Sequence, residues 1–190
     1  MARYGTDHKL ATRRRILEAA GRRLKRDGID GSGVATLMAD AGLTNGAFYA
    51  HFDSKEDLVA NTVADQLREQ RETYSAHSLD EIVRGYLSLQ HRDDMEGGCP
   101  SAALLDEIAR SSDAVKRAYT DAQLAIINDV AARLAPDDPR SARVQALGAF
   151  ALMVGTLQVS RALGDKRLAD DVLEQGIQNA LALLGSGRQD

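Results

Sequence analysis

Apolar residues recur at intervals of three and four along most of the chain, the spacing that places them on one face of an α-helix. Ile16, Leu17, Ala20 and Leu24, for example, form one continuous stripe of this kind. β-branched residues are sparse and do not alternate with polar ones over the length of a strand. The pattern therefore predicts an all-α fold.

Glycine, proline and capping residues divide the pattern into about nine helices. Gly28 is expected to adopt the left-handed conformation that ends the first helix, and Gly42 to make the turn after the second. Ser54 and Asp57 have the spacing of a capping box for the fourth helix, and Pro139 is expected in the first turn of the eighth. The predicted helices span residues 7–27, 34–41, 44–51, 54–76, 79–91, 100–110, 113–134, 139–163 and 166–184.

The composition agrees with a compact helical protein. The chain has 190 residues, of which 44% are hydrophobic, and this is typical of one or two globular domains. Its single cysteine cannot build an internal disulfide framework, so a reducing compartment, the cytoplasm, is expected. The longest uncharged run, residues 144–160, is short for a membrane span and contains two glutamines, so we expect no membrane partner.

Charge is distributed unevenly along the chain, although the net charge is only -4. Residues 1–27 carry nine basic and three acidic side chains, a local +6, whereas residues 62–190 carry 14 basic and 20 acidic ones, a local -6. A basic first helix suits a polyanion, and an acidic remainder is repelled by one. Any nucleic acid is therefore expected to contact the N-terminal third, although basic runs are commonly just solvated helix faces.

Residues 34–51 have the length and glycine punctuation of a helix-turn-helix, whose second helix enters the major groove of DNA. Three of the chain's eight aromatic residues fall within five positions near its end. Phe48 and Phe52 are four apart, so we expect them to lock the second helix onto the domain core.

The opposite face of the same helix is predicted to carry Asn45 and Tyr49. The small Gly46 and Ala47 beside them permit close approach to the bases. A side-chain amide bonds bidentately to adenine, which is worth about 1 to 3 kcal/mol of discrimination between bases. This face is the candidate for reading a DNA sequence.

At these residues the chain resembles the TetR family of transcriptional regulators, over about residues 8 to 60. Gly33 and Met38 depart from the family, which usually has a Ser or Thr N-cap at the first position and a small residue at the second. The resemblance implies a three-helix helix-turn-helix DNA-binding domain (1–53) followed by a helical ligand-binding and dimerisation domain (54–190). The segments that carry it are residues 12–20, Gly28, Val34, residues 39–44, residues 46–52 and residues 54–58.

The resemblance also implies a role for each residue of the motif. Those expected at base edges or the groove wall are Asn45, Gly46, Ala47 and Tyr49; those expected at phosphates are Thr44, His51 and Lys55, with Arg13 and Arg14 as backbone clamps. Tyr49 as a core aromatic, His51 as a group at a helix C-terminus and Lys55 as a surface lysine are the alternatives.

A single short helix reads only one half-site, so we expect a homodimer on a palindromic operator in double-stranded DNA. The last two helices carry apolar residues at spacings of three and four, which predicts a four-helix dimer bundle. The alternative is that these residues form the internal core of a monomer. The predicted interface residues are Leu147, Phe150, Val154, Leu157, Val172, Ile177, Leu181 and Leu184.

A pocket for a small-molecule effector is expected among the middle helices. The candidates for its lining are Tyr86, Met95, Cys99, Tyr119 and Phe150. Residues 97–101 resemble a Gly-Cys-Pro turn found in one branch of the family, which would place Cys99 just before a helix N-terminus. Such a position lowers a thiol pKa, so Cys99 is either a sensor of electrophiles and oxidants or an inert buried side chain.

Two other functions compete with a DNA-binding regulator: an all-α enzyme, and a helical interaction module that does not bind DNA. The sequence has no Glu-x-x-His pair, its four histidines are scattered, and it lacks a nucleophile motif and a phosphate-binding glycine loop. We therefore expect neither enzymatic activity nor a metal or cofactor. The predicted function is a DNA-binding repressor released by a ligand, with activation or ligand-induced binding as variants of the same reading.

Overall fold

The computed structural model describes residues 2–185, with side chains from residue 7. Over this range it contains nine α-helices, one 3-10 helix and no strand, which confirms the all-α prediction. The N-terminal helices are α1 (Ala2–Asp27), α2 (Val34–Asp40) and the 3-10 helix η1 (Asn45–Ala50). They are followed by α3 (Lys55–Ser75), α4 (Leu79–Tyr86), α5 (Leu89–Asp93), α6 (Pro100–Arg110), α7 (Asp113–Leu134), α8 (Arg143–Ala162) and α9 (Lys166–Leu183).

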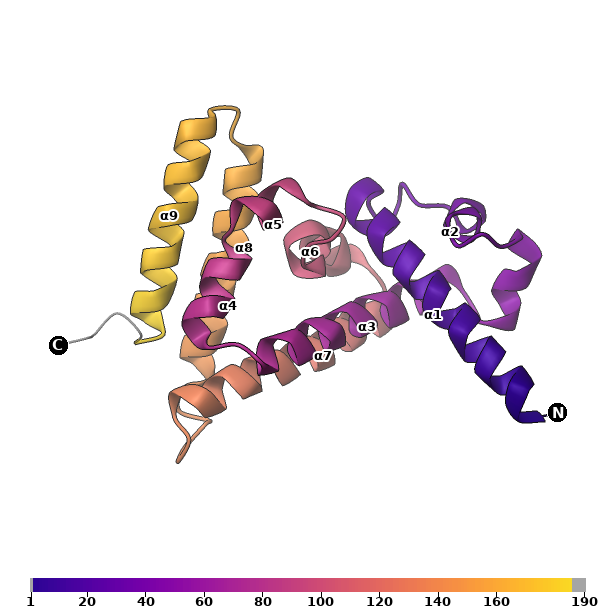
Figure 1. The fold of residues 1–190 in the computed structure, drawn as a ribbon, viewed down its shortest axis with the longest axis horizontal. Helices are drawn as coiled ribbons and strands as arrows, with labels where there is room; N and C mark the ends of the chain where they lie inside the picture. The colour runs from indigo at the N-terminus through magenta and orange to yellow at the C-terminus, as the bar shows by residue number, and fades with distance from the viewer. Residues whose placement is uncertain (1, 186–190) are drawn as a thin grey trace.

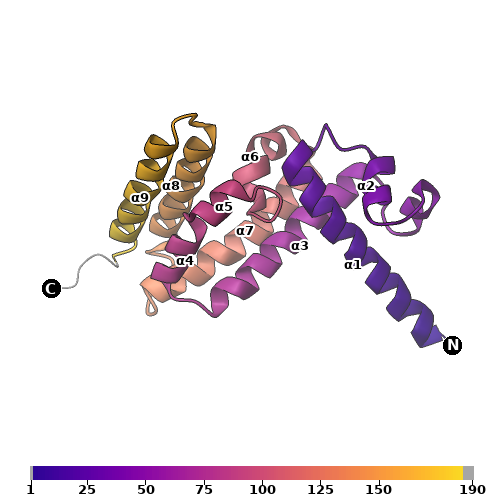
Figure 2. The same ribbon diagram turned by 45° about the horizontal axis from the view of Figure 1, so that its top comes forward.

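The helices form an elongated molecule with a different group at each end (Figures 1 and 2). The N-terminal helices α1, α2 and η1 lie at one end, and the antiparallel pair α8 and α9 lies at the other. Between them α3 and α7 run side by side, and α6 packs against α1, α7 and α8. The middle helices therefore connect the basic end of the molecule to the helical pair.

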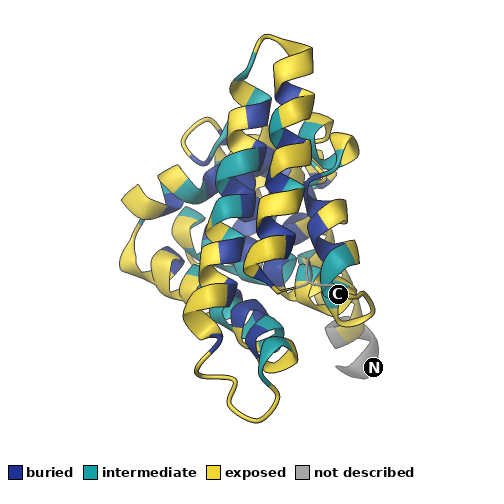
Figure 3. Ribbon diagram, turned by 90° about the vertical axis from the view of Figure 1, so that its left-hand side faces the viewer, coloured by how far each residue is buried: buried dark blue, intermediate teal, exposed yellow. Residues whose placement is uncertain are grey.

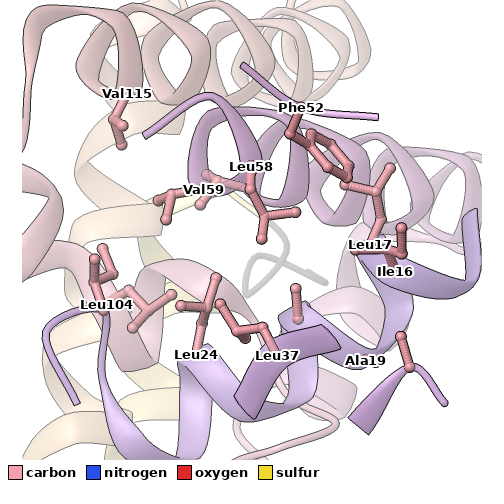
Figure 4. Packing of buried hydrophobic residues seen from close by; sticks show 14 of the residues in the cluster. Ile16, Leu17, Ala19, Leu24, Leu37, Phe52, Leu58, Val59, Leu104 and Val115 are labelled. Atoms are coloured by element: carbon pink, nitrogen blue, oxygen red, sulfur yellow. The ribbon is translucent and has the colours of Figure 1, made fainter. Parts of the chain in front are cut away.

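The first hydrophobic core joins the N-terminal helices to the middle of the chain (Figure 4). Ile16 and Leu24 of α1 pack in it with Leu37 of α2, Leu58 of α3 and Leu104 of α6. The predicted domain boundary after residue 53 stays a prediction, because this core extends across it. Because the core is shared, a shift of α3 or α6 would change the packing around α1.

The second core lies between α4, the start of α6, α8 and α9. Gly176 of α9 faces Thr156 so closely that a Cβ at position 176 would overlap the threonine side chain. This close approach buries Val154, Leu157, Leu181 and Leu184 inside the chain itself, each at 7% exposure or less. Their prediction as dimer-interface residues is therefore wrong, and the internal-core alternative applies to these four.

The helix boundaries depart from the predicted ones by more than one residue in three places. The first helix begins at Ala2 instead of residue 7. The segment predicted as one helix over residues 79–91 forms two helices, because the chain turns after Tyr86. Ser88 then caps α5: its side-chain oxygen accepts a hydrogen bond from the His91 amide. The described residues therefore contain ten helices instead of nine. Pro139 lies in a turn and α8 begins only at Arg143, so its placement in a first helical turn is wrong.

Several local predictions are confirmed. Gly28 and Gly42 adopt positive φ angles of 80° and 67°, the left-handed region that glycine tolerates without strain. Ser54 caps α3 by accepting a hydrogen bond from the Asp57 amide at 3.1 Å. Gly33 precedes α2 without a side-chain cap, and Met38 is fully buried within the first core.

Candidate functional site

The helix η1 presents one side to the core and the other to solvent. Phe48 and Phe52 are 1% and 2% exposed, with ring centroids 5.8 Å apart, and Phe52 packs in the same cluster as Leu17 (Figure 4). Tyr49, between them in sequence, is 77% exposed, so it does not fill the core. The inward prediction for the two phenylalanines is confirmed, and they fix the orientation of the outward face.

The outward face is short and uncharged. Thr44, Asn45 and Gly46 are exposed, whereas Ala47 is half-buried against the first core. Thr44 occupies the N-cap position of η1 but makes no side-chain capping bond, so its hydroxyl is available for another partner. Because η1 is a 3-10 helix with about three residues per turn, Asn45 and Tyr49 lie about a third of a turn apart and not on one line.

Arg13 braces this helix from α1. Its guanidinium donates to the His51 carbonyl and, at 2.9 Å, to Asn61 Oδ1, and it lies 4.2 Å from the centroid of the Phe52 ring. These internal bonds occupy the group that was predicted to clamp a phosphate. Arg14, in contrast, is exposed and pairs only with Glu18 on its own helix.

His51 and Lys55 flank the end of η1. Burial, and then the nearby Lys9 and Arg13, lowers the pKa of His51, so the imidazole is uncharged at neutral pH and meets a phosphate only through a hydrogen bond. Lys55 is half-buried at the start of α3, where it lines a cavity of about 270 Å³ with Glu107.

A larger cavity of about 560 Å³ lies between the end of α1, α3, α4, α5 and the loop before α6. Tyr86 and Cys99 line it, as predicted, and both are buried. The other three candidates lie elsewhere. Met95 is exposed, and the Tyr119 hydroxyl lies 3.2 Å from Ser101 Oγ. Phe150, on α8, packs against the second core.

His91 joins the two buried residues of this cavity wall. Its Nδ1 donates to the Tyr86 carbonyl at 2.7 Å, and its Nε2 accepts from the Cys99 amide at 2.9 Å, which assigns the tautomer. Its ring meets the Tyr86 ring edge-on, with centroids 4.7 Å apart. Burial lowers the pKa of His91, so this histidine is a neutral strut.

Lys25 of α1 also lines the cavity, and the sequence analysis missed it. It is 5% exposed, and its ammonium donates to the Gly98 carbonyl at 2.7 Å. Burial lowers its pKa to about 8, against the opposing effect of nearby groups that include Asp94. The signal was present, because Leu17, Gly21 and Lys25 follow one another at intervals of four, which places Lys25 on the buried stripe of α1.

Figure 3 shows exposed positions between buried ones along the helices that face the viewer, and α8 and α9 include apolar residues among their exposed positions. The exposed fractions are 79% for Val144, 46% for Leu147 and 48% for Leu168. The predicted interface residues Phe150, Val172 and Ile177 are half-buried. Of the predicted set, Leu147 is thus the residue that lies fully on the outer surface.

Two kinds of feature are absent from the described residues. None of their helices combines the length and the apolar character that a membrane crossing requires. They also contain no group of three or more His, Cys, Asp or Glu side chains arranged to hold a metal ion.

Comparison with known proteins identifies the N-terminal region. A sequence model of the bacterial regulatory proteins of the tetR family matches residues 16–62, which contain α2, η1 and the start of α3. The HTH-type transcriptional repressor AcnR of Corynebacterium efficiens is 33% identical over 88 residues, covering 46% of this chain and 47% of the repressor. Residues 16–62 therefore belong to a TetR-family N-terminal region. The chain spans about half the length of the curated TetR-family relatives it matches.

Solved structures extend the likeness to the whole TetR fold. A TetR-family transcriptional regulator from Cytophaga hutchinsonii has a TM-score of 0.73 at 20% identity, covering 96% of this chain and 98% of its own. FadR of Bacillus subtilis, solved in complex with stearoyl-CoA, has a TM-score of 0.63 at 18% identity, covering 92% and 98%. At such identities the likeness is one of fold.

Proposed function

We propose that this TetR-family protein is a repressor that binds a palindromic operator in double-stranded DNA as a homodimer and is released by a small-molecule effector. The observation that carries the proposal is the exposed face of η1, which Phe48 and Phe52 hold outward from the core. The similar AcnR proteins are transcriptional repressors. A regulator that binds chromosomal DNA works in the cytoplasm.

In this proposal the candidate DNA-contacting residues divide into two groups. Asn45, Gly46 and Tyr49 read base edges, with Ala47 at the groove wall. The phosphate contacts come from Thr44, His51, Lys55 and Arg14, and they position the helix without reading sequence. Arg13 acts indirectly, because its bonds to the His51 carbonyl and Asn61 hold η1 in place.

The dimer is proposed to form through the outer faces of α8 and α9, with Leu147 as one of its apolar contacts. Val144 and Leu147, near the start of α8, and Leu168, near the start of α9, are exposed apolar side chains. A second copy related by a two-fold axis would cover them and place two η1 helices on successive turns of the duplex.

The test is binding of the full chain to DNA from upstream of its own gene, followed by fluorescence anisotropy at several salt concentrations. Asn45→Ala is expected to cost about 1 to 3 kcal/mol on the preferred sequence and to relax the preference. Lys55→Ala is expected to weaken binding to all DNA and reduce the salt slope by about one unit. Lys116→Ala, an exposed lysine on α7, is the matched control and should bind like wild type.

Wild-type affinity in both Asn45→Ala and Lys55→Ala would refute this docking. Absence of any preference among duplexes at modest salt would refute the proposed function as a whole.

The effector is proposed to bind in the 560 Å³ cavity, whose volume is within the range of small-molecule sites. The cavity lies between α1 and the middle helices, so a ligand bound there can shift α1 and thereby change DNA binding. A thiol sensor at Cys99 is the alternative; at 5% exposure this cysteine meets an oxidant only after the cavity wall opens. Unchanged release of DNA by electrophiles in Cys99→Ser would eliminate that alternative.

A further inference from the structure

One wall of the cavity combines a buried cation with a buried tyrosine hydroxyl. The Lys25 ammonium donates to the Gly98 carbonyl at 2.7 Å, and it forms no ion pair with a carboxylate of the described residues. Tyr86 is 3% exposed, and its hydroxyl makes no hydrogen bond of normal geometry within the described range, although the Cys99 side chain is close enough to interact with it. Buried polar groups are normally satisfied, so this pair points to a ligand.

The two groups belong to one continuous wall. Gly98, which accepts from Lys25, is followed by Cys99, whose amide is bonded to His91. The His91 ring in turn packs edge-on against Tyr86. Gly98 has to be glycine there, because a Cβ would lie 2.6 Å from His91 Nε2. The wall is thus a built surface with fixed donor positions.

The charge of the wall is a single positive one. His91 is neutral and uses both ring nitrogens within the wall, so it adds no cation. Glu69, Glu81 and Asp94 also line the cavity, but all three are exposed, and their charges are screened by water. A monoanion therefore balances Lys25, whereas a dianion would leave one buried charge without a counterion.

We propose that the cavity binds a small organic monocarboxylate whose anionic group pairs with Lys25, with the Tyr86 hydroxyl as a second donor. This inference rests on the proposed function and names the chemical class of its effector. Tyr74, Ile82 and Pro100 line the same cavity and supply apolar surface for the carbon chain of the ligand. An ammonium-carboxylate bond in such a place is charge-assisted and stronger than the existing bond to a neutral carbonyl.

The position of Lys25 links this ligand to the DNA-binding end. Lys25 lies on α1, the helix that also carries the Arg13 brace of η1. A carboxylate that takes over the ammonium releases the Gly98 carbonyl and so removes one tie between α1 and the loop before α6. Ligand binding then acts directly on the helix that supports η1.

The experiment is isothermal titration of the full chain, without DNA, with straight-chain monocarboxylates of four to ten carbons and the matching primary alcohols and alkyl phosphates. Carboxylates are expected to bind more tightly than both other series. Lys25→Met should lose about tenfold or more in affinity, and Tyr86→Phe about three- to tenfold, by loss of a charge-assisted and an ordinary hydrogen bond. Lys116→Met, on the exposed face of α7, should bind like wild type.

Three outcomes would overturn the inference: no binding by any carboxylate, alcohols or phosphates that bind as tightly as carboxylates, or wild-type affinity in Lys25→Met. Circular dichroism confirms that each variant is folded before titration. Because no DNA is present, failure here leaves the operator-binding result unaffected, and failure of operator binding leaves this titration interpretable.

Discussion

At the scale of single residues, Lys25 is the side chain whose surroundings differ most from those its type prefers. Lysines are almost never fully buried unless they are paired, yet this one is 5% exposed and bonded to a neutral carbonyl. Its pKa of about 8 expresses the cost of keeping the charge out of water. We expect a protein to retain a buried charge of this kind when the residue binds a ligand. The desolvation of Lys25 should then lower the measured free energy of unfolding.

Lys25→Met is expected to raise the free energy of unfolding at pH 7 by about 1 to 3 kcal/mol, because it removes a desolvated charge and keeps the packing. The folded pKa is lowered from 10.5 to about 8, so between these values the unfolded chain holds more protons and wild-type stability rises with pH. The advantage of the variant should be largest below pH 8 and shrink toward pH 10.5.

Urea unfolding of both proteins from pH 6 to pH 10.5 provides the measurement. The difference between them isolates Lys25 from the other groups that titrate in this range. A difference that is independent of pH, or a variant less stable than wild type at pH 7, would contradict the prediction.

At the scale of elements, α6 is held to the N-terminal helices near both of its ends. The loop before it accepts the Lys25 bond at Gly98, and Glu107 near its end accepts hydrogen bonds from the amides of Ile29, at 2.6 Å, and Asp30, at 3.3 Å. The left-handed Gly28 brings these amides to the carboxylate. A side chain of α6 therefore satisfies the backbone amides in the turn between α1 and α2.

Glu107→Gln is expected to lower the free energy of unfolding by about 1 to 2 kcal/mol, because the amide oxygen accepts from the same two N–H groups without the charge. Hydrogen exchange at Ile29 and Asp30 should accelerate in the same variant. Asp106→Asn, the exposed neighbour on α6, is the control and should change neither quantity. Equal effects of both substitutions would show that Glu107 has no special role.

At the scale of the whole molecule, the two ends carry different properties. The basic N-terminal helices lie at one end, and the apolar outer faces of α8 and α9 lie at the other (Figure 1). In the proposed function, this separation lets the protein approach DNA with one end while a second copy covers the opposite one. The proposed dimer makes the two functions depend on each other, since one η1 helix reads only half a palindrome.

Leu147→Glu is expected to halve the mass measured by light scattering at micromolar concentration, because a charge is placed on the proposed interface. Operator affinity should fall by about a hundredfold or more, as only one half-site remains engaged. Leu89→Glu is the matched control, since Leu89 is 52% exposed on α5. A mass equal to that of wild type in Leu147→Glu would exclude this face as the dimer interface.

Much of the fold and of the proposed DNA-binding face follows from the sequence because its signals are local. Three- and four-residue spacing defines the helices, Gly28 and Gly42 end two of them, and the i, i+4 pair of Phe48 and Phe52 orients η1. Each of these features depends on residues within one or two turns, so a single sequence contains the information.

Tertiary packing decided what covers each apolar stripe. The spacing in α8 and α9 is the same whether a stripe meets its own chain or a second copy, and only the close approach at Gly176 shows that Val154 and Leu157 belong to the internal core. Likewise, the spacing of four puts Lys25 on the inner side of α1, but the Gly98 carbonyl comes from 73 residues away. Long-range contacts of this kind cost loop-closure entropy and leave no local pattern, so the structure was needed to find the cavity and its cation.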